Sequence, residues 1–105
     1  MADFAIRGTT PLVVFDVDMD LREADRIRVI FRQCGEVVIA AELDRLTVEE
    51  DSISLTLTQE ETLAFCSNRD RPIEIQIRAL LGVTAAACEP FETSVGRLID
   101  DEEVI

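Results

Sequence analysis

Apolar and polar residues alternate along most of the chain, and this alternation predicts β-strands. In residues 26–33 every second position carries Ile, Val or Phe on one face, and residues 52–57 repeat the pattern with Ile and Leu. Side chains of a strand point alternately to its two faces, so a period of two indicates a strand with one buried face. Seven strands are predicted, over residues 10–17, 26–33, 36–42, 46–48, 52–57, 73–81 and 84–98, with a bulge in the last at Glu89 and Pro90.

The connections between these segments carry residues typical of turns and of a helix start. Cys34 and Gly35 predict a tight turn that joins residues 26–33 and 36–42 in a β-hairpin. After residue 57 the alternation stops, and Thr58 precedes Glu61 in a capping box, where each side chain bonds an amide of the first helical turn. We therefore predict one short helix of about two turns that ends by Cys66.

Many short strands, regularly spaced turns and one helix favour an all-β fold. We predict an immunoglobulin-like antiparallel β-sandwich of about seven strands with one short helical crossover. Residues 1–105 carry no linker, repeat or low-complexity stretch, so we expect a single β-sandwich domain. Residues from about 99 to 105 are mostly acidic and are expected to form a C-terminal tail.

The charge and composition of the chain argue against several classes of partner and of catalytic or metal site. The net charge is −12, with 22 acidic and 10 basic residues, all of the latter Arg. Such a surface repels phosphate groups, so we expect neither nucleic acid nor a membrane as a partner. The absence of His removes the commonest general base and metal ligand. The three cysteines, Cys34, Cys66 and Cys88, are too far apart in sequence for a zinc motif, and we expect free thiols and no cofactor.

One motif points to an enzyme. Residues 12–18 run an apolar strand into Asp16-x-Asp18, which resembles the nucleophile strand of haloacid-dehalogenase-like phosphatases. The resemblance implies that Asp16 attacks phosphorus and Asp18 protonates the leaving group around a magnesium ion. That family needs a parallel, doubly wound sheet and a late basic residue, whereas this chain predicts antiparallel strands. We therefore interpret the aspartates as the solvated end of a core strand and expect no enzymatic activity.

The same aspartates also have the spacing of calcium ligands. Asp16, Asp18 and Asp20 take the first, third and fifth positions of an EF-hand loop, but Leu21 stands where Gly is needed and Ile27 where Glu is needed. An EF-hand is thereby excluded. Weak metal binding by these three carboxylates stays open, and the alternative function is a small metal- or ligand-binding β-sandwich that uses the loop from Asp16 to Asp20.

Arginines gather on one predicted strand. Arg26, Arg28 and Arg32 share a face of residues 26–33, and Arg78 comes from a later strand. They either pair with glutamates on neighbouring strands or form a basic stripe for an acidic neighbouring subunit. The candidate interface residues on the outer faces are Arg26, Arg28, Ile30, Arg32 and Val38.

Several segments together resemble a known group of proteins. They are residues 6–11 (Ile-Arg-Gly-Thr-Thr-Pro), 26–33, 55–62, 75–78 and 94–98. The chain resembles small prophage-encoded proteins of Gram-positive bacteria, found among tail and baseplate components, and the N-terminal sandwich domain of phage baseplate upper proteins. The resemblance implies an immunoglobulin-like sandwich and assembly into a virion substructure.

The expected function follows from this resemblance. We expect a non-enzymatic phage or prophage structural or assembly protein, a tail or baseplate component that acts through protein–protein contacts. Its expected partners are other phage structural proteins and further copies of itself in a homo-oligomer. The expected location is the virion, or the host cytoplasm during assembly.

Overall fold

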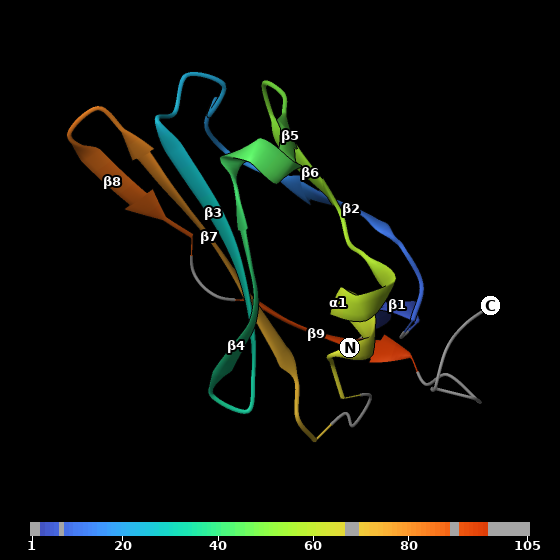
Figure 1. Cartoon of the computed structure of the whole chain (residues 1–105). Helices are drawn as coiled ribbons and strands as arrows, with labels where there is room; N and C mark the ends of the chain where they lie inside the picture. The colour runs from blue at the N-terminus through green and yellow to red at the C-terminus, as the bar shows by residue number, and fades with distance from the viewer. Residues whose placement is uncertain (1–2, 7, 67–69, 89–90, 97–105) are drawn as a thin grey trace.

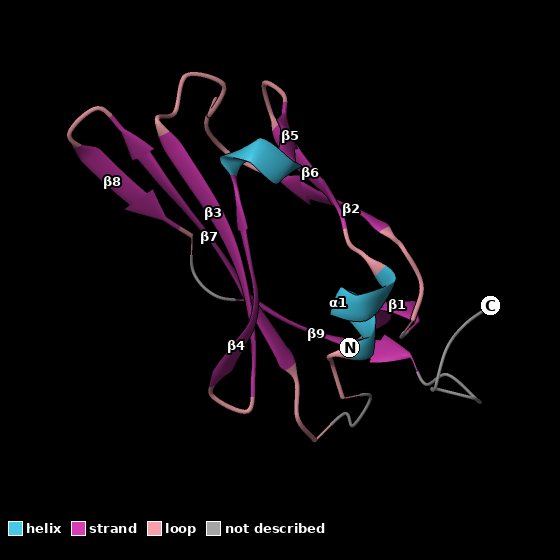
Figure 2. Cartoon of the chain, viewed as in Figure 1, coloured by secondary structure: helices cyan, strands magenta, loops and turns pink. Residues whose placement is uncertain are grey.

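Strands account for most of the chain, as the alternation predicts. The structure, a computed structural model, describes residues 3–6, 8–66, 70–88 and 91–96 (Figures 1 and 2). In these residues the elements are β1 (Asp3–Ile6), β2 (Leu12–Asp16), β3 (Arg26–Gln33), β4 (Glu36–Glu42), the 3-10 turn η1 (Leu43–Arg45), β5 (Leu46–Val48), β6 (Ser52–Thr56), α1 (Gln59–Leu63), β7 (Ile73–Leu81), β8 (Thr84–Ala87) and β9 (Phe91–Gly96). The expected bulge at residues 89–90 and the tail at 99–105 lie outside the described residues.

The strands form two sheets that pack face to face. One sheet has the order β1-β9-β7-β3-β4, with β8 also paired to β7, and the other has the order β2-β6-β5. Neighbouring strands are antiparallel except β1 and β9, which are parallel. The predicted all-β sandwich is thus confirmed. Nine strands are described instead of seven, because β1 shows no clear alternation and the last predicted strand is divided into β8 and β9.

The strand order is that of an immunoglobulin-like sandwich. Such domains keep strands A, B, E and D in one sheet and C, F and G in the other, sometimes with an added strand C′. In this chain β2, β6 and β5 occupy the places of B, E and D. Strands β3, β7 and β9 occupy those of C, F and G, and β4 that of C′. The first strand departs from the four-strand sheet, since β1 pairs with β9 and not with β2.

Phenylalanine rings lie at the centre of the core between the sheets. Phe31 of β3 is fully buried, and its ring centroid lies 6.4 Å from that of Phe15 on β2 and 5.9 Å from that of Phe65. The rings meet edge-on or tilted, the arrangements that aromatic pairs prefer. Phe31 therefore joins both sheets and the segment after α1 in one core. The inward residues of β3 and β7 predicted from the alternation are also buried, namely Ile27, Val29, Ile73, Ile75, Ile77 and Ala79.

The β3–β4 hairpin contains one deviation from the predicted pattern. Its turn is as expected, with positive φ at Cys34 (55°) and Gly35 (77°), as a two-residue hairpin turn requires. Beyond the turn, the register shifts between Phe31 and Arg32 of β3, and Val38 of β4 is left without a partner on β3. As a result Val37 is 59% exposed while Val38 packs against the core. The predicted outward position of Val38 is therefore wrong, and Val37 takes the outward position instead.

Helix α1 begins at the predicted capping box. The Thr58 side chain accepts a hydrogen bond from the Glu61 amide (3.2 Å), and the Glu61 carboxylate accepts one from the Thr58 amide (2.8 Å). Glu61 also forms an ion pair with Arg45 of η1, at 2.6 Å. The buried Thr62 hydroxyl donates to the carbonyl of Thr9, 2.7 Å away. The helix is one residue longer than a single turn, so these contacts hold it in place.

A buried glutamine fixes the connection between α1 and β7. The Gln33 side chain amide donates to the carbonyls of Cys66 and Arg71, and its oxygen accepts from the Cys66 amide, all at 2.8 Å. Gln33 follows Phe31 on the inward face of β3 and is only 6% exposed. One side chain thus satisfies three backbone groups of Cys66 and Arg71.

Candidate protein-interaction site

The aspartate loop lies where β2 leaves its sheet. Asp16 is the last residue of β2 and is exposed, and Asp18 is exposed in the loop that follows. Asp20 is engaged with Arg22, whose backbone amide and guanidinium donate to its carboxylate at 2.6–3.1 Å. These hydrogen bonds lower the pKa of Asp20 from 3.8 to about 2. The loop therefore divides into a self-paired part at Asp20 and two carboxylates, those of Asp16 and Asp18, that form no ion pair with any described residue.

The expected calcium ligands are not brought together. Within residues 3–6, 8–66, 70–88 and 91–96, no three carboxylate or thiol groups gather so that they could hold a metal ion. Asp16, Asp18 and Asp20, the weak candidates for metal binding, therefore do not form a three-carboxylate cluster in the described residues. The physical reason is the hydrogen bonding of Asp20 to Arg22, which turns the third carboxylate toward its own loop.

The scaffold that the phosphatase motif needs is likewise missing from the described residues. Strand β2 is paired only with β6, and the pairing is antiparallel. A doubly wound phosphatase places its nucleophile strand inside a parallel sheet covered by helices on both faces. Asp16 thus stands at the end of a sandwich strand, as we interpreted it.

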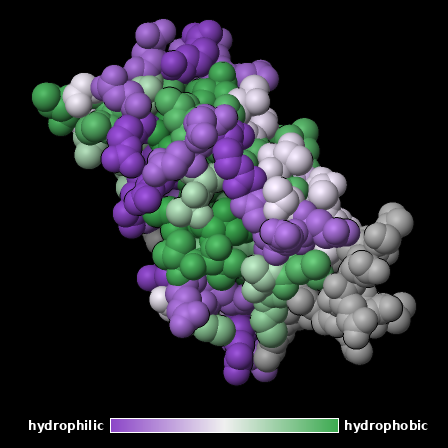
Figure 3. Space-filling model, viewed as in Figure 1, coloured by the Kyte–Doolittle hydropathy of each residue, from purple (hydrophilic) through white to green (hydrophobic). Residues whose placement is uncertain are grey.

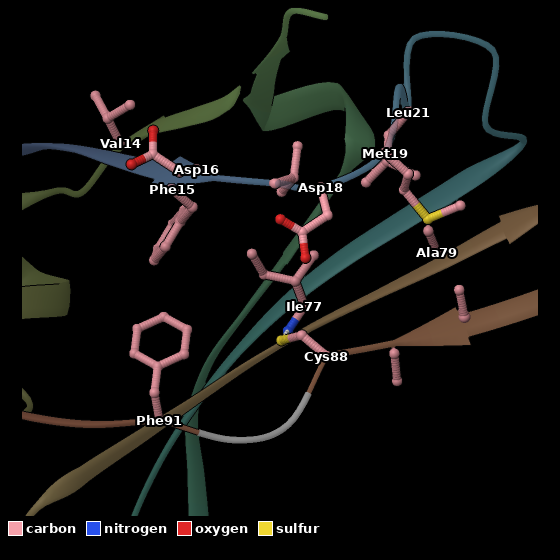
Figure 4. A pocket seen from close by; sticks show the side chains of 13 residues that line it. Val14, Phe15, Asp16, Asp18, Met19, Leu21, Ile77, Ala79, Cys88 and Phe91 are labelled. Atoms are coloured by element: carbon pink, nitrogen blue, oxygen red, sulfur yellow. Dashed lines mark hydrogen bonds between the residues drawn. The ribbon is translucent and has the colours of Figure 1, made fainter. Parts of the chain in front are cut away.

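Beside the aspartates an apolar cleft opens between the two sheets. It has a volume of about 490 Å³ and is shown in Figure 4. One wall comes from β2 and the loop after it, and the other from β7, β8 and β9. The lining residues are Val14, Phe15, Asp16, Val17, Asp18, Met19, Leu21, Ile77, Ala79, Ala86, Ala87, Cys88 and Phe91.

Small side chains on the far wall leave the cleft open. Strand β8 carries a run of alanines, two of which line the cleft, and an Ala side chain fills little of the space between the sheets. Figure 4 shows Phe15 and Phe91 pointing into the cleft from opposite walls, with centroids 6.0 Å apart. Phe91 is nevertheless 42% exposed, since no other element in the described part of the chain packs over its open side. The cleft is therefore an uncovered part of the core.

The cysteine in the cleft is turned toward β7. The Cys88 amide donates to the carbonyl of Ile77 (3.0 Å), and its sulfur accepts a hydrogen bond from the Ile77 amide (3.2 Å). The Cys88 thiol thus replaces a backbone carbonyl in the ladder, at the point where β8 ends. All three cysteines are free, as the sequence predicts.

Strand β2 has an unpaired edge at the mouth of this cleft. Its pairing with β6 is extended at both ends, by bonds from the Leu57 amide to the Pro11 carbonyl (3.0 Å) and from the Val17 amide to the Asp51 carbonyl (2.9 Å). Hydrogen-bonded pairs alternate along an antiparallel ladder, so the odd-numbered residues from 11 to 17 direct their backbone groups at β6. The even-numbered residues direct theirs at the opposite edge.

That opposite edge is apolar and carries free hydrogen-bonding groups. The outward backbone groups belong to Leu12, Val14 and Asp16, and no strand in the described part of the chain pairs with them. Leu12 is 65% exposed and Val14 55% exposed. Soluble proteins commonly protect such edges with charges, proline or a bulge within the strand, and β2 has only Asp16 at its end. The backbone groups on this edge can therefore form hydrogen bonds with another strand.

The candidate arginines lie on the other face of the molecule. Arg26 and Arg28 donate to Glu42 (3.2 and 3.1 Å), and Arg32 pairs with Glu74 (3.0 Å). These ion pairs match the first of the two alternatives for the arginines, namely pairing with glutamates on neighbouring strands. Ile30 lies among them and is half-buried, whereas Val38 is on the core side. This face thus neutralises much of its own charge.

Comparisons with protein-family models, with curated proteins and with solved structures find no match. Among the described residues no helix has the length and apolar character needed to cross a membrane.

Proposed function

We propose that this chain is a non-enzymatic structural or assembly protein that acts through protein–protein contacts. The observation that supports this proposal is the apolar cleft beside the outer edge of β2, which has no partner among the described strands. An unprotected strand edge next to exposed core residues tends to associate, so a protein that keeps one gains from a partner that covers it. The contact site is accordingly the side of the sandwich formed by β2 and β8.

The specific assembly that we propose is a phage or prophage tail or baseplate. This part rests on the resemblance of the sequence to tail- and baseplate-associated proteins, and the immunoglobulin-like strand order is the fold that the resemblance implies. The partners are then other phage structural proteins and further copies of the chain, and the location is the virion or the host cytoplasm during assembly. The net charge of −12 supports binding to proteins with basic surfaces.

Sedimentation velocity and light scattering test this proposal. The purified protein is measured across concentrations, alone and mixed with the products of the genes that flank its own. We expect oligomers or a mixed complex, and tail or tape-measure genes among the neighbours. A strict monomer that binds none of these products would contradict the proposal.

A second candidate function is the binding of a small ligand by the Asp16–Asp20 loop. The observation in its favour is that the cleft includes Asp16 and Asp18 and has a volume within the range of about 300–1,000 Å³ that is common for ligand pockets. Titration calorimetry with calcium and with magnesium tests the metal-dependent form. Absence of heat with both ions would remove it.

A further inference from the structure

Strand β2 lacks the neighbour that its position in the fold provides for. In an immunoglobulin-like sandwich, strand A pairs with the outer edge of strand B, and β2 holds the place of strand B. We propose that an extended segment of a different protein binds at this edge as an added strand and fills the cleft. This inference deepens the proposed function, on which it rests, by naming the site and the chemistry of the partner.

The backbone of β2 can accept such a strand without rearrangement. Leu12, Val14 and Asp16 already direct their N–H and C=O groups outward in regular strand geometry. An added strand would bond these groups and continue the sheet β2-β6-β5 by one member. Strand addition of this kind takes its affinity from main-chain hydrogen bonds and its specificity from pockets for alternate side chains.

The cleft supplies those pockets. Every second side chain of the added strand would point between the sheets, where Phe15, Ile77 and Phe91 form an apolar surface. The intervening side chains would point outward, beside the exposed Leu12 and Val14. The occupant is therefore apolar at the inward positions, with residues large enough to fill a space walled on one side by alanines.

The charged residues at the rim of the cleft indicate which charge the partner segment carries at one end. Among the described residues that line the cleft, Asp16 and Asp18 are the charged ones and none is basic. In Figure 4 the Asp18 carboxylate points toward the β7 side of the cleft. A Lys or Arg at the end of the added strand that lies next to these aspartates would pair with them. The partner segment thus has alternating apolar residues and a basic end.

A second copy of this chain does not meet these requirements. If two β2 edges paired, the inward side chains of each, such as Phe15, would remain in their own sandwich, and both clefts would stay unfilled. The two chains would also bring together the carboxylates of two molecules that each carry a net charge of −12. A segment from a different, more basic chain would fill the cleft, and its positive charge would attract the aspartates where a second copy would repel them.

The test uses isotope-labelled protein and NMR, with a synthetic peptide as the probe. The peptide alternates Val and Thr and ends in Lys-Lys, and a matched peptide ends in Glu-Glu. We expect the Lys peptide to shift the amide signals of Leu12, Val14 and Asp16 and to slow their exchange with solvent, and the Glu peptide to bind more weakly. Signals that shift only on β4 or β8, or equal binding of both peptides, would overturn the proposal.

Variants at Val14 and Val37 provide the matched comparison, since these valines are exposed to a similar extent. V14P removes an outward N–H without touching the ladder to β6, and V14K places a positive charge beside the basic end of the peptide. We expect each to weaken peptide binding by about tenfold or more, and V37K to leave it unchanged. Unchanged binding by folded V14P and V14K would contradict added-strand pairing.

The two proposals fail in different ways. If the protein joins an assembly and V14K joins it equally well, the role in assembly stands, while the β2 edge is wrong both as the contact site and as the place of the added strand. If the protein joins no assembly, the proposed function fails, while the peptide experiment still decides whether β2 accepts a strand.

Discussion

The two long sides of the sandwich are built differently. On the side of β4 and β5, η1 crosses from one sheet to the other, and four half-buried apolar residues pack against the core, namely Val38, Leu43, Leu46 and Val48. Figure 3 shows apolar residues between β4 and α1 in the centre of the view, with polar residues around them. On the side of β2 and β8 no described element crosses between the sheets, and the cleft exposes part of the same core.

The ion pair of Arg45 with Glu61 reinforces the closed side only. Arg45 also donates to the carbonyl of Thr56 (3.1 Å), at the end of β6. The closed side thus joins η1, β6 and α1 through one guanidinium, whereas Asp16 and Asp18 at the rim of the open side form no ion pair within the described residues. If the open side is the contact site that we propose, substitutions there should affect stability less than substitutions on the closed side or in the core, and four sets of variants test this.

The largest effect is expected from the core that both sides share. Phe31→Ala removes a fully buried ring between the sheets and should lower the free energy of unfolding by about 3–5 kcal/mol. Phe91→Ala, in the open cleft, should cost about 1 kcal/mol because the ring is already partly exposed. Chemical denaturation followed by circular dichroism measures both. Equal losses would mean that the cleft is as tightly packed as the core.

The second effect concerns the buried hydrogen bonds near α1. Gln33→Leu leaves the carbonyls of Cys66 and Arg71 and the Cys66 amide without their partner, which should cost about 1–3 kcal/mol. Hydrogen exchange at the Cys66 amide should rise in the variant. Unchanged exchange would show that another group satisfies this connection. Gln59→Leu, at a half-buried position in the first turn of α1, serves as the control, with little change expected.

A smaller effect, dependent on pH, is expected from the ion pair on the closed side. Hydrogen bonds from Arg45, and secondarily from the Thr58 amide, lower the pKa of Glu61 below its ordinary value of 4.5. The stabilisation is therefore complete above pH 4.5 and is lost as the pH falls through the lowered pKa of the folded state. Glu61→Gln should cost about 0.5–1 kcal/mol at neutral pH and progressively less in acid. Thermal unfolding of both proteins across pH measures this, and a difference that does not change with pH would contradict it.

The smallest effect on stability is expected at the open edge. Val14→Lys should change the free energy of unfolding by no more than about 0.5 kcal/mol, because the side chain is exposed and packs on little. The partly buried Val38→Lys, on the closed side, should cost clearly more. Denaturant titration of the pair compares them directly. A large loss for V14K would show that β2 needs its edge for folding and not for contact.

The sequence predicts those features that depend on neighbours along the chain. The alternation in β3 and β7 reports their buried faces, and the capping box at Thr58 reports the start of α1. The inward position of Gln33 was also visible, because it continues the series of Ile27, Val29 and Phe31. Its three bonds were not, since they depend on where the segment from Cys66 to Arg71 lies in space.

The features that the sequence does not predict arise from pairing between distant segments. A bulge of one residue in β4 exchanges the faces of Val37 and Val38 without changing the composition of the strand. Because β1 pairs with β9, the outer edge of β2 has no partner among the described strands, and only this topology brings Phe15, Ile77 and Phe91 together in one cleft. The sequence of the aspartate motif suggests catalysis or metal binding. The structure instead places Asp16 and Asp18 at the rim of the cleft.

The way in which the two sheets are joined has a consequence for where this protein can fold. Antibody domains join their sheets by a disulfide between strands B and F, which packs on a tryptophan. Here the corresponding strands β2 and β7 carry no cysteine between Leu12 and Asp16 or between Ile73 and Leu81, and the rings of Phe15 and Phe31 lie at the centre. Folding therefore requires no oxidising compartment and no disulfide isomerase, and a reducing agent should leave the unfolding curve unchanged.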